Sequence, residues 1–394
     1  MAQLLLLRGA KQLLTLRGPS GVRRGAALND LGIIEDGSVL IRDRRILSVG
    51  PTRRIENLKE SRGAIDVPVT GCVVMPGFVD PAIHVSLYEN RASVAPVPKR
   101  KKALKFYEES LLLIRSCLQH GTLNAQVKVY AEASSPAADL AALRQLATIG
   151  NVPVSIVRSL RLATTALDEP KLAALAARLA LLRRRDFVHC LELLANPEMG
   201  LPSHAFWDVL AQIGLPRNLV WPGDAPVELL RHLLEQARPR SVFCPAELSP
   251  SETFALAQSP SIAVFSPCKE LLEERENPSA KKLLDAGGAI ALASGYDSKD
   301  APIFSMQMVV ALAVLRLRLT AEQAIAATTI NAAHALGCAD EVGSLEAGKR
   351  ADILVLSLSD YREIPRRIGV NQILMAIREG NFMVNRRRAA KASA

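Results

Sequence analysis

The sequence predicts an α/β protein that combines a (β/α)8 TIM-like barrel with a small discontinuous β-sandwich domain formed by both termini. Between residues 72 and 295, eight short apolar runs alternate with Ala- and Leu-rich stretches. The runs lack regular polar alternation, which is typical of parallel strands buried on both faces of a barrel sheet. The two ends of the chain are rich in short strand-like segments, so they most economically share one sheet. We expect a sandwich domain at residues 1–72 plus 341–390, a barrel at 73–340, and the end of a disordered basic tail at 391–394.

The expected segments follow one another in a regular order. Residues 39–50 (VLIRDRRILSVG) alternate between apolar and polar side chains and end at a Gly-Pro turn, as a hairpin does. The barrel strands are expected at Cys72–Asp80, Leu123–Tyr130, Val152–Leu160, Phe187–Glu192, Asn218–Pro222, Ser241–Pro245, Ser261–Pro267 and Ala289–Gly295. The helices between them are expected at Ala137–Ile149, Pro170–Arg185, Pro226–Ala237 and Ser279–Ala286. A long helical region over Met308–Leu336 then leads to a strand at Ile353–Leu358, which returns to the terminal domain.

The charge of the chain is concentrated in three short runs. The formal net charge is +10, from 49 Lys and Arg against 39 Asp and Glu. The runs Lys99–Lys102, Arg183–Arg185 and Arg386–Arg388 match this whole excess, so the remainder is formally neutral. The first run is interpreted as a solvated face, with a contact to an acidic partner as the alternative. No aromatic interleaving or nucleic-acid motif accompanies the runs, so nucleic-acid binding is not expected.

Cysteine usage and hydropathy bear on the compartment. The six cysteines are scattered, and none forms a C-x-x-C pair. This is typical of reduced, mostly buried thiols in a cytoplasmic protein rather than of a structural zinc site. No apolar run approaches the roughly 20 residues of a membrane span, and Leu4–Leu7 is too brief for the apolar region of a signal peptide. We therefore expect a cytoplasmic protein without a membrane segment.

Motifs near both ends of the barrel resemble those of a known group. Met75–Asp80 (MPGFVD) looks like the start of the first barrel strand in the amidohydrolase superfamily, and Gly343–Asp352 (GSLEAGKRAD) looks like the superfamily's closing segment. The C-terminal sequence is similar to that of imidazolonepropionases, which hydrolyse a cyclic amide, at Asp360–Pro365 (DYREIP) and Gly369–Asn371 (GVN). The chain is identified as an imidazolonepropionase-like member of that superfamily.

The resemblance implies a zinc or iron ion that activates water, held at the carboxyl ends of the barrel strands. The first ligand pair of the family is His-x-His, and of this pair only His84 remains. The degenerate metal-ligand positions are Ala82 on the first strand, Trp221 or Pro222 on the fifth, Pro245 on the sixth and Gly295 on the eighth. Because four positions have lost their donors together, the metal is expected to be absent.

Several polar residues still fall where a pocket is expected, although none is a confident catalytic residue. The candidates are His84, Arg91, Lys128, His189, Glu192 and Asp297. His84 is either a residual ligand or base, or a hydrogen-bonded relic, and Lys128 has a structural or a ligand role. By resemblance, Arg91 lies where the family holds the substrate carboxylate, a task that suits a guanidinium. Asp297 replaces a family Asn and would repel an anionic substrate.

These observations predict that the chain has lost metal-dependent hydrolysis. A structural, regulatory or partner-subunit role is expected instead, most simply within a homodimer or a larger protein assembly. One alternative is an active hydrolase of C–N bonds in cyclic amides, with a site rebuilt from His84 and either His189 or Glu192. Another is a metal-free protein that binds a small carboxylate and keeps Arg91 for this purpose.

Overall fold

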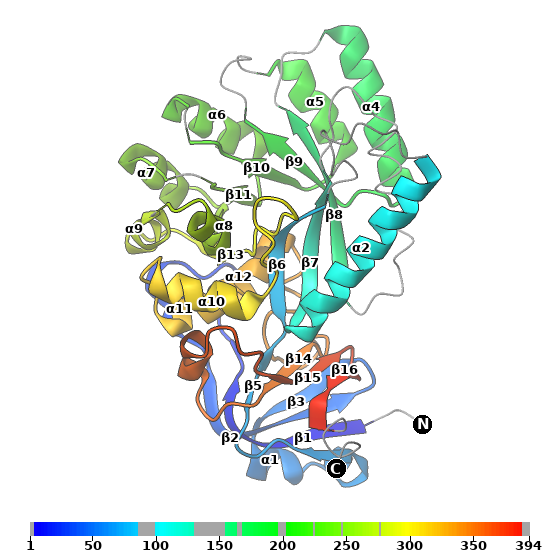
Figure 1. Cartoon of the computed structure of the whole chain (residues 1–394), viewed down its shortest axis with the longest axis vertical. Coiled ribbons are helices and arrows are strands. Elements are labelled where there is room, and N and C mark those ends of the chain that lie inside the picture. Colours follow the sequence, from blue (N-terminus) through cyan, green and yellow to red (C-terminus); the bar gives the residue numbers. More distant parts are fainter. Residues whose placement is uncertain are drawn as a thin grey trace.

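The computed structural model describes residues 4–85, 99–129, 154–163, 168–195, 202–223, 225–245, 247–275 and 277–387. Their strands form two sheets of eight strands each. One sheet makes the barrel in the upper part of Figure 1, and the other lies below it and contains both ends of the described chain. The predicted fold class is confirmed.

The barrel sheet is parallel and runs in sequence order from β6 to β13. Its strands are β6 (Phe78–Val85), β7 (Thr122–Val129), β8 (Ser155–Ala163), β9 (Cys190–Leu194), β10 (Arg217–Val220), β11 (Ser241–Phe243), β12 (Ile262–Phe265) and β13 (Ile290–Leu292). Each of the eight expected apolar runs overlaps one of them. The first and last strands also meet, because the His84 amide donates to the Tyr296 carbonyl at 2.8 Å. The barrel is therefore nearly closed.

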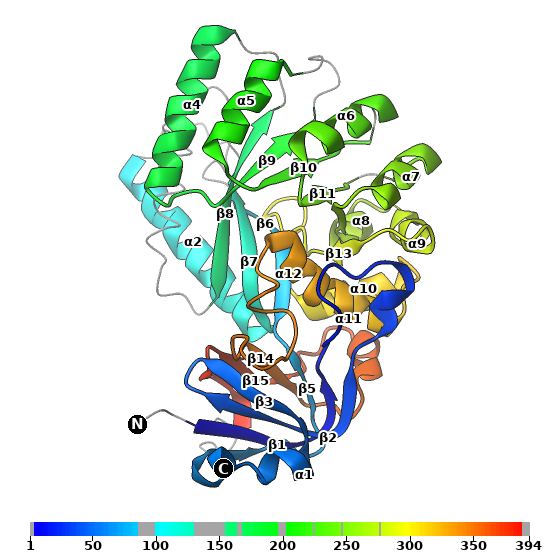
Figure 2. The same ribbon diagram turned by 180° about the vertical axis from the view of Figure 1, so that it is seen from behind.

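Helices cover the outside of the barrel (Figures 1 and 2). They are α2 (Lys99–Gln119), α4 (Glu169–Arg184), α5 (His204–Ile213), α6 (Val227–Ala237), α7 (Pro250–Gln258), α8 (Pro267–Leu272), α9 (Ser279–Asp285), α10 (Met306–Leu315), α11 (Ala321–Ala327) and α12 (Ile330–Leu336). The helical region expected over Met308–Leu336 contains three helices, and Thr320 begins the second of them, α11, with a capping box. The basic run Lys99–Lys102 begins α2. The helix expected at Ala137–Ile149 lies outside the described residues.

The terminal sheet is mixed and unites both ends of the chain. Its strands are β1 (Leu4–Leu14), β2 (Ile33–Arg42), β3 (Arg45–Pro51), β4 (Ile65–Pro68), β5 (Val73–Pro76), β14 (Ile353–Leu356), β15 (Ile373–Arg378) and β16 (Asn381–Asn385). The antiparallel pairing of β14 with β5 joins the two halves. All eight strands belong to one hydrogen-bonded sheet, so the predicted sandwich is built as a single continuous sheet. The short helix α1 (Thr52–Glu56) packs against β2 and β3.

The chain passes from the terminal sheet to the barrel at Gly77. The single strand predicted over Cys72–Asp80 is in fact two strands, β5 and β6, in different sheets. A side chain at residue 77 would lie 2.5 Å from Cδ1 of Leu123, so only glycine allows the backbone to come this close. Strand β6 also continues to Val85, which brings His84 into the barrel wall.

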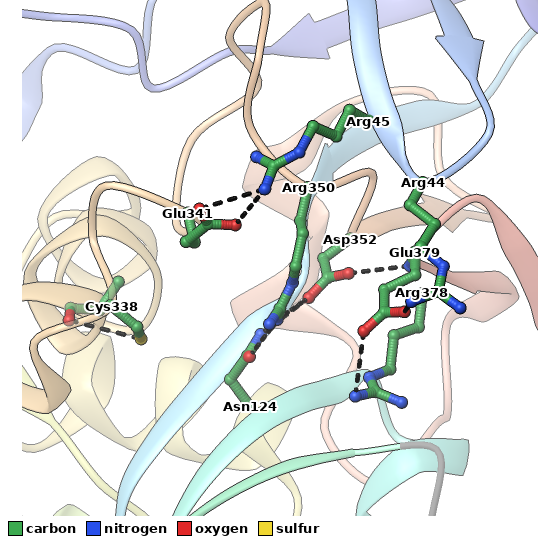
Figure 3. A network of polar contacts seen from close by, with 10 residues as sticks. Arg44, Arg45, Asn124, Cys338, Glu341, Arg350, Asp352, Arg378 and Glu379 are labelled. Carbon is green, nitrogen blue, oxygen red and sulfur yellow. Dashed lines mark hydrogen bonds and ion pairs between the residues drawn. The ribbon is translucent and has the colours of Figure 1, made fainter.

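A polar network holds the terminal sheet against the amino end of β7 (Figure 3). Asn124 donates from Nδ2 to Oδ2 of Asp352 at 3.2 Å and accepts from Nη2 of Arg350 at 2.6 Å. The Glu379 amide donates to the second Asp352 oxygen at 3.0 Å. We call Asn124, Arg350, Asp352 and Glu379 the junction network. The closing segment recognised in the sequence, which ends at Asp352, therefore joins the two sheets.

Candidate functional site

The carboxyl ends of the parallel strands, which we call the barrel mouth, contain a buried group of charged side chains. Lys128 near the end of β7 and Arg161 near the end of β8 both contact Glu192 on β9. The Lys128 ammonium pairs with Oε1 of Glu192, while Arg161 donates from Nε and Nη2 to Oε2 at 2.7 and 2.6 Å. We call Lys128, Arg161 and Glu192 the mouth triad. Its single carboxylate faces two cations.

His84 lies beside this triad. On the paired strands β6 and β7 it is the register partner of Lys128, so the two residues lie at the same level of the barrel. Phe243, the last residue of β11, lies close to both. Its ring centroid is 6.1 Å from that of His84, in an edge-to-face arrangement, and 4.7 Å from Nζ of Lys128. The aromatic face therefore offers the ammonium a cation–π contact in addition to its ion pair.

Burial and charge fix the ionisation of the group. Burial first, and then the Lys128 ammonium, lower the pKa of His84 well below its usual value, so the imidazole is neutral at pH 7. Burial alone would raise the pKa of Glu192, but the cations of Lys128 and Arg161 outweigh it and hold the pKa at about 2. Burial lowers the pKa of Lys128, while Glu192 opposes that shift. With Lys128 and Arg161 protonated, the mouth triad has a formal charge of one positive unit.

The positions that the family resemblance assigns to metal ligands are occupied by residues that pack in the core or lack a metal-binding side chain. Ala82 is fully buried. Trp221 is also fully buried, and its indole Nε1 donates to Oε1 of Glu252 at 2.5 Å. Gly295 has φ +62°, and a Cβ there would collide with Oγ of Ser266 and lie 2.7 Å from its Cβ. This position thus has no room for a carboxylate side chain.

Among the described residues, the side chains at these positions do not fit a catalytic zinc or iron ion. Such a site needs about three protein ligands with lone pairs, usually imidazoles and a carboxylate. Proline, alanine and glycine side chains offer none, and the indole N–H of tryptophan is a donor only. Across the part of the chain that the structure describes, no three His, Cys, Asp or Glu side chains are grouped so that they could hold a metal ion.

The remaining predicted residues lie elsewhere. His189 precedes β9, at the amino end of that strand, where Nδ1 accepts from the Arg158 amide at 3.2 Å and Nε2 lies 3.4 Å from Asp186. The structure therefore does not bring His189 to His84. Asp297 lies in the loop after β13, where its carboxylate accepts from the amide of Lys299 at 2.9 Å. Arg91 is outside the described residues. Pro222 and Pro245 are half-buried just after β10 and β11.

Sequence reasoning missed two residues of the mouth. Arg161 escaped because the apolar run of its strand was ended at Leu160, whereas β8 continues to Ala163. The alternation of Ser159 and Arg161 on one strand face was the available signal. Asp80 was treated only as part of a motif. It is fully buried and accepts from the Ser294 amide at 3.1 Å and the Ser294 hydroxyl at 2.5 Å, which ties β6 to the end of β13.

The barrel fold and the closing segment Gly343–Asp352 define an amidohydrolase-type barrel. Two solved structures share it over 97% or more of this chain. The atrazine chlorohydrolase TrzN from Arthrobacter aurescens TC1, complexed with zinc, aligns with a TM-score of 0.70 and 15% identity, covering 99% of both chains. The guanine deaminase of E. coli aligns with a TM-score of 0.65 and 16% identity, covering 97% of this chain and 99% of that one. At these identities the likeness shows the fold alone.

Sequence comparison identifies the family. The sequence model of the Amidohydrolase family matches residues 242–383. The imidazolonepropionase of Chloroflexus aggregans is 30% identical, over 96% of this chain and 98% of its own length. That of Symbiobacterium thermophilum is also 30% identical, over 97% of both chains. The chain belongs to the imidazolonepropionase-like amidohydrolases, as its sequence motifs predicted.

Proposed function

We propose that this chain does not catalyse metal-dependent hydrolysis and acts as a structural, regulatory or partner subunit. One observation carries the proposal: the ligand positions at the mouth contain Ala82, Trp221, Pro222, Pro245 and Gly295. The contacts of Trp221 with Glu252 and the collision that a side chain at Gly295 would make with Ser266 support it further, because neither position can supply a ligand without repacking. Glu192, the carboxylate of the mouth triad, is already paired with two cations.

Metal analysis combined with an activity assay tests this proposal. The protein is purified from zinc- and iron-supplemented medium, and its metal content is measured by plasma mass spectrometry. We expect far less than one zinc or iron per chain and no hydrolysis of a five-membered cyclic amide. Near-stoichiometric metal together with turnover contradicts the proposal. The matched control is His84→Ala, because turnover that survives this change comes from a contaminating enzyme.

The same assay decides the alternative of an active hydrolase with a rebuilt site. That alternative required His84 to work with His189 or Glu192. His189 lies at the amino end of β9 with Arg158 and Asp186, so only Glu192 remains. A carboxylate whose pKa is held at about 2 is a poor general base, because it is a much weaker base than groups that titrate near neutral pH. Turnover abolished by His84→Ala would favour this alternative.

A partner-subunit role is supported by an apolar patch near the end of α2. A cavity of about 260 Å3 there is lined by residues that include Phe304 and Met308. Ile368 and Val370 line the same cavity and are about half exposed. Patches of this kind mark protein contacts more often than single exposed apolar residues do. We propose a homodimer, to be tested by light scattering of the native chain and of Val370→Asp, for which a monomer is expected.

The net positive charge of the mouth triad favours a second candidate, a metal-free protein that binds a small carboxylate. Arg161 keeps part of its side chain exposed, at 15%, and a guanidinium attracts a carboxylate. Thermal-shift screening with small carboxylates, including imidazole carboxylates, tests it at constant ionic strength. Ligand binding should raise the melting temperature with occupancy. Loss of this response in Arg161→Gln or Arg91→Ala would support the candidate, and an unchanged response in both would exclude it.

Compartment and membrane contact are addressed by two findings. All six cysteines carry free thiols, which supports the proposed cytoplasmic location because that compartment keeps thiols reduced. Among the described helices, none is long and apolar enough to cross a bilayer. Fractionation of cells that express the native chain measures the location directly, and recovery with the cytosolic fraction is expected.

A further inference from the structure

A charged cavity lies at the end of the barrel opposite the mouth. It has a volume of about 330 Å3 and opens where β10 and β11 begin, whereas the mouth lies where these strands end. Its walls are formed by two short segments that lead into these strands. The lining residues are Gly214, Leu215, Pro216, Arg217, Arg238 and Arg240. Three of the six are arginines, and none is acidic.

The positive charge of this cavity is not balanced by its own walls. Burial lowers the pKa of Arg217, and the neighbouring guanidinium of Arg238 lowers it further. Because like charges repel one another, an anion bound among these arginines would lower the free energy of the folded chain. Arg183, from the second basic run of the sequence, lies at the edge, because its Nη1 would be 3.3 Å from a Cβ on Gly214.

The arginines are held in place by the fold. Arg240 donates from Nη1 to the Leu336 carbonyl at 2.9 Å, at the end of α12. The Arg240 amide donates to the Arg217 carbonyl at 2.8 Å, which fixes the two backbones side by side. Arg238 occupies a left-handed position with φ +43° after α6, where glycine or asparagine is usual. Because an arginine at this position has a conformational cost, we infer that the Arg238 side chain has a role.

We propose that this cavity is a binding site for a phosphoryl group, either inorganic phosphate or a small phosphomonoester. Guanidinium groups match phosphate oxygens bidentately, and three of them neutralise a dianion with charge to spare. A volume of about 330 Å3 also admits a small organic group besides the phosphate. The site is independent of the mouth, so it stands or fails separately from the loss of hydrolysis.

Calorimetry and thermal melts of the full chain with sodium phosphate test this site, with sodium chloride at matched ionic strength as the salt control. We expect saturable binding to the native chain and a rise in melting temperature. Arg217→Gln/Arg238→Gln should weaken phosphate binding at least about tenfold, which corresponds to about 1.4 kcal/mol. Arg231→Gln, which removes one exposed charge from α6 outside this cavity, is the matched control and should bind phosphate like the native chain.

Two further arms separate the outcomes. Glycerol 3-phosphate that binds at least tenfold more tightly than phosphate identifies a phosphomonoester site, and equal affinities identify a site for inorganic phosphate. Should the double variant fail to fold, Arg238→Gln alone removes an exposed side chain and should still weaken binding. The proposal is overturned if phosphate stabilises the native chain no more than chloride does. Equal phosphate affinities in the native chain and the arginine variants overturn it as well.

Discussion

The two ends of the barrel each contain a buried carboxylate that is held by an arginine, but the surroundings differ. At the mouth, Glu192 is paired with Lys128 and Arg161 from the neighbouring strands β7 and β8. At the junction network, Asp352 is bound by Arg350 and by Asn124, from the other sheet. The mouth contacts stay within three strands of one sheet, whereas the junction contacts join two sheets. The junction charges therefore have an architectural role that can be read directly from their partners.

This difference shows why charged residues at a barrel mouth are not enough to indicate catalysis. A metal ligand or a general base must keep lone pairs and charge available to the reacting group. Both oxygens of Glu192 contact Lys128 or Arg161, and the positions that the family resemblance assigns to metal ligands hold Trp221 and Gly295. The polar residues of the mouth thus stabilise each other, much as those of the junction do. Substitutions at four positions test how far this parallel extends, namely Glu192, Asp80, Asp352 and Gly295.

The largest effect is expected for Glu192→Gln at the mouth. The change removes the carboxylate charge that Lys128 and Arg161 both contact in a buried setting, which should lower the free energy of unfolding by about 3–5 kcal/mol. Urea denaturation of the variant and the native chain measures the difference. Glu228→Gln, on the exposed side of α6, is the matched control and should change stability by less than about 0.5 kcal/mol. A loss of unfolding free energy in Glu192→Gln as small as that of the control would show that the charges of the mouth triad are not buried.

The second effect is a dependence on pH that comes from Asp80, at the closure of the mouth. Burial raises the pKa of Asp80 to about 6, although the Ser294 hydroxyl opposes the shift. The folded chain thus keeps a proton that the unfolded chain releases near pH 4. Stability should consequently fall by about 3 kcal/mol as the pH rises from 3 to 7.

Asp80→Asn isolates this contribution. The amide oxygen can still accept from the Ala82 and Ser294 amides, and the new NH2 group can donate to the Ser294 hydroxyl. The difference in unfolding free energy between the variant and the native chain, measured by urea denaturation, should therefore shift by about 3 kcal/mol between pH 3 and pH 7, in favour of the variant at the higher pH. A constant difference across this range would mean that Asp80 ionises normally in the folded chain.

The third effect is at the junction network, in Asp352→Asn. Asp352 is buried, but Arg350 keeps 19% of its side chain exposed, so water compensates for part of the lost charge. We expect a loss of about 2–3 kcal/mol in unfolding free energy, less than for Glu192→Gln. Arg362→Gln removes an exposed arginine of the same C-terminal region and is the control. A loss larger than that of Glu192→Gln would reverse the order of the two networks.

Local pattern predicted most of the fold, while contacts between distant residues lay beyond it. The eight strand runs were visible because buried parallel strands are continuously apolar. The break at Gly77 was hidden, since apolar residues continue across it and only the packing of Leu123 requires it. The metal-ligand positions could be aligned from motifs, and this alignment predicted the loss of a metal ligand at Trp221. No pattern could show that Glu252, 31 residues further on, would bond to its indole.

The smallest effect is expected at Gly295, the position where the family resemblance places the carboxylate of the eighth strand. Gly295→Ala forces an L side chain into φ +62° and pushes it against Ser266, so we expect a loss of about 2 kcal/mol in urea denaturation. Ser266→Gly removes the colliding atoms, and the double variant should therefore recover the part that comes from the collision but not the part that comes from φ. If Gly295→Ala were neutral, the mouth would have space to regain a carboxylate at this position, and Gly295 would no longer support the proposed loss of the metal site.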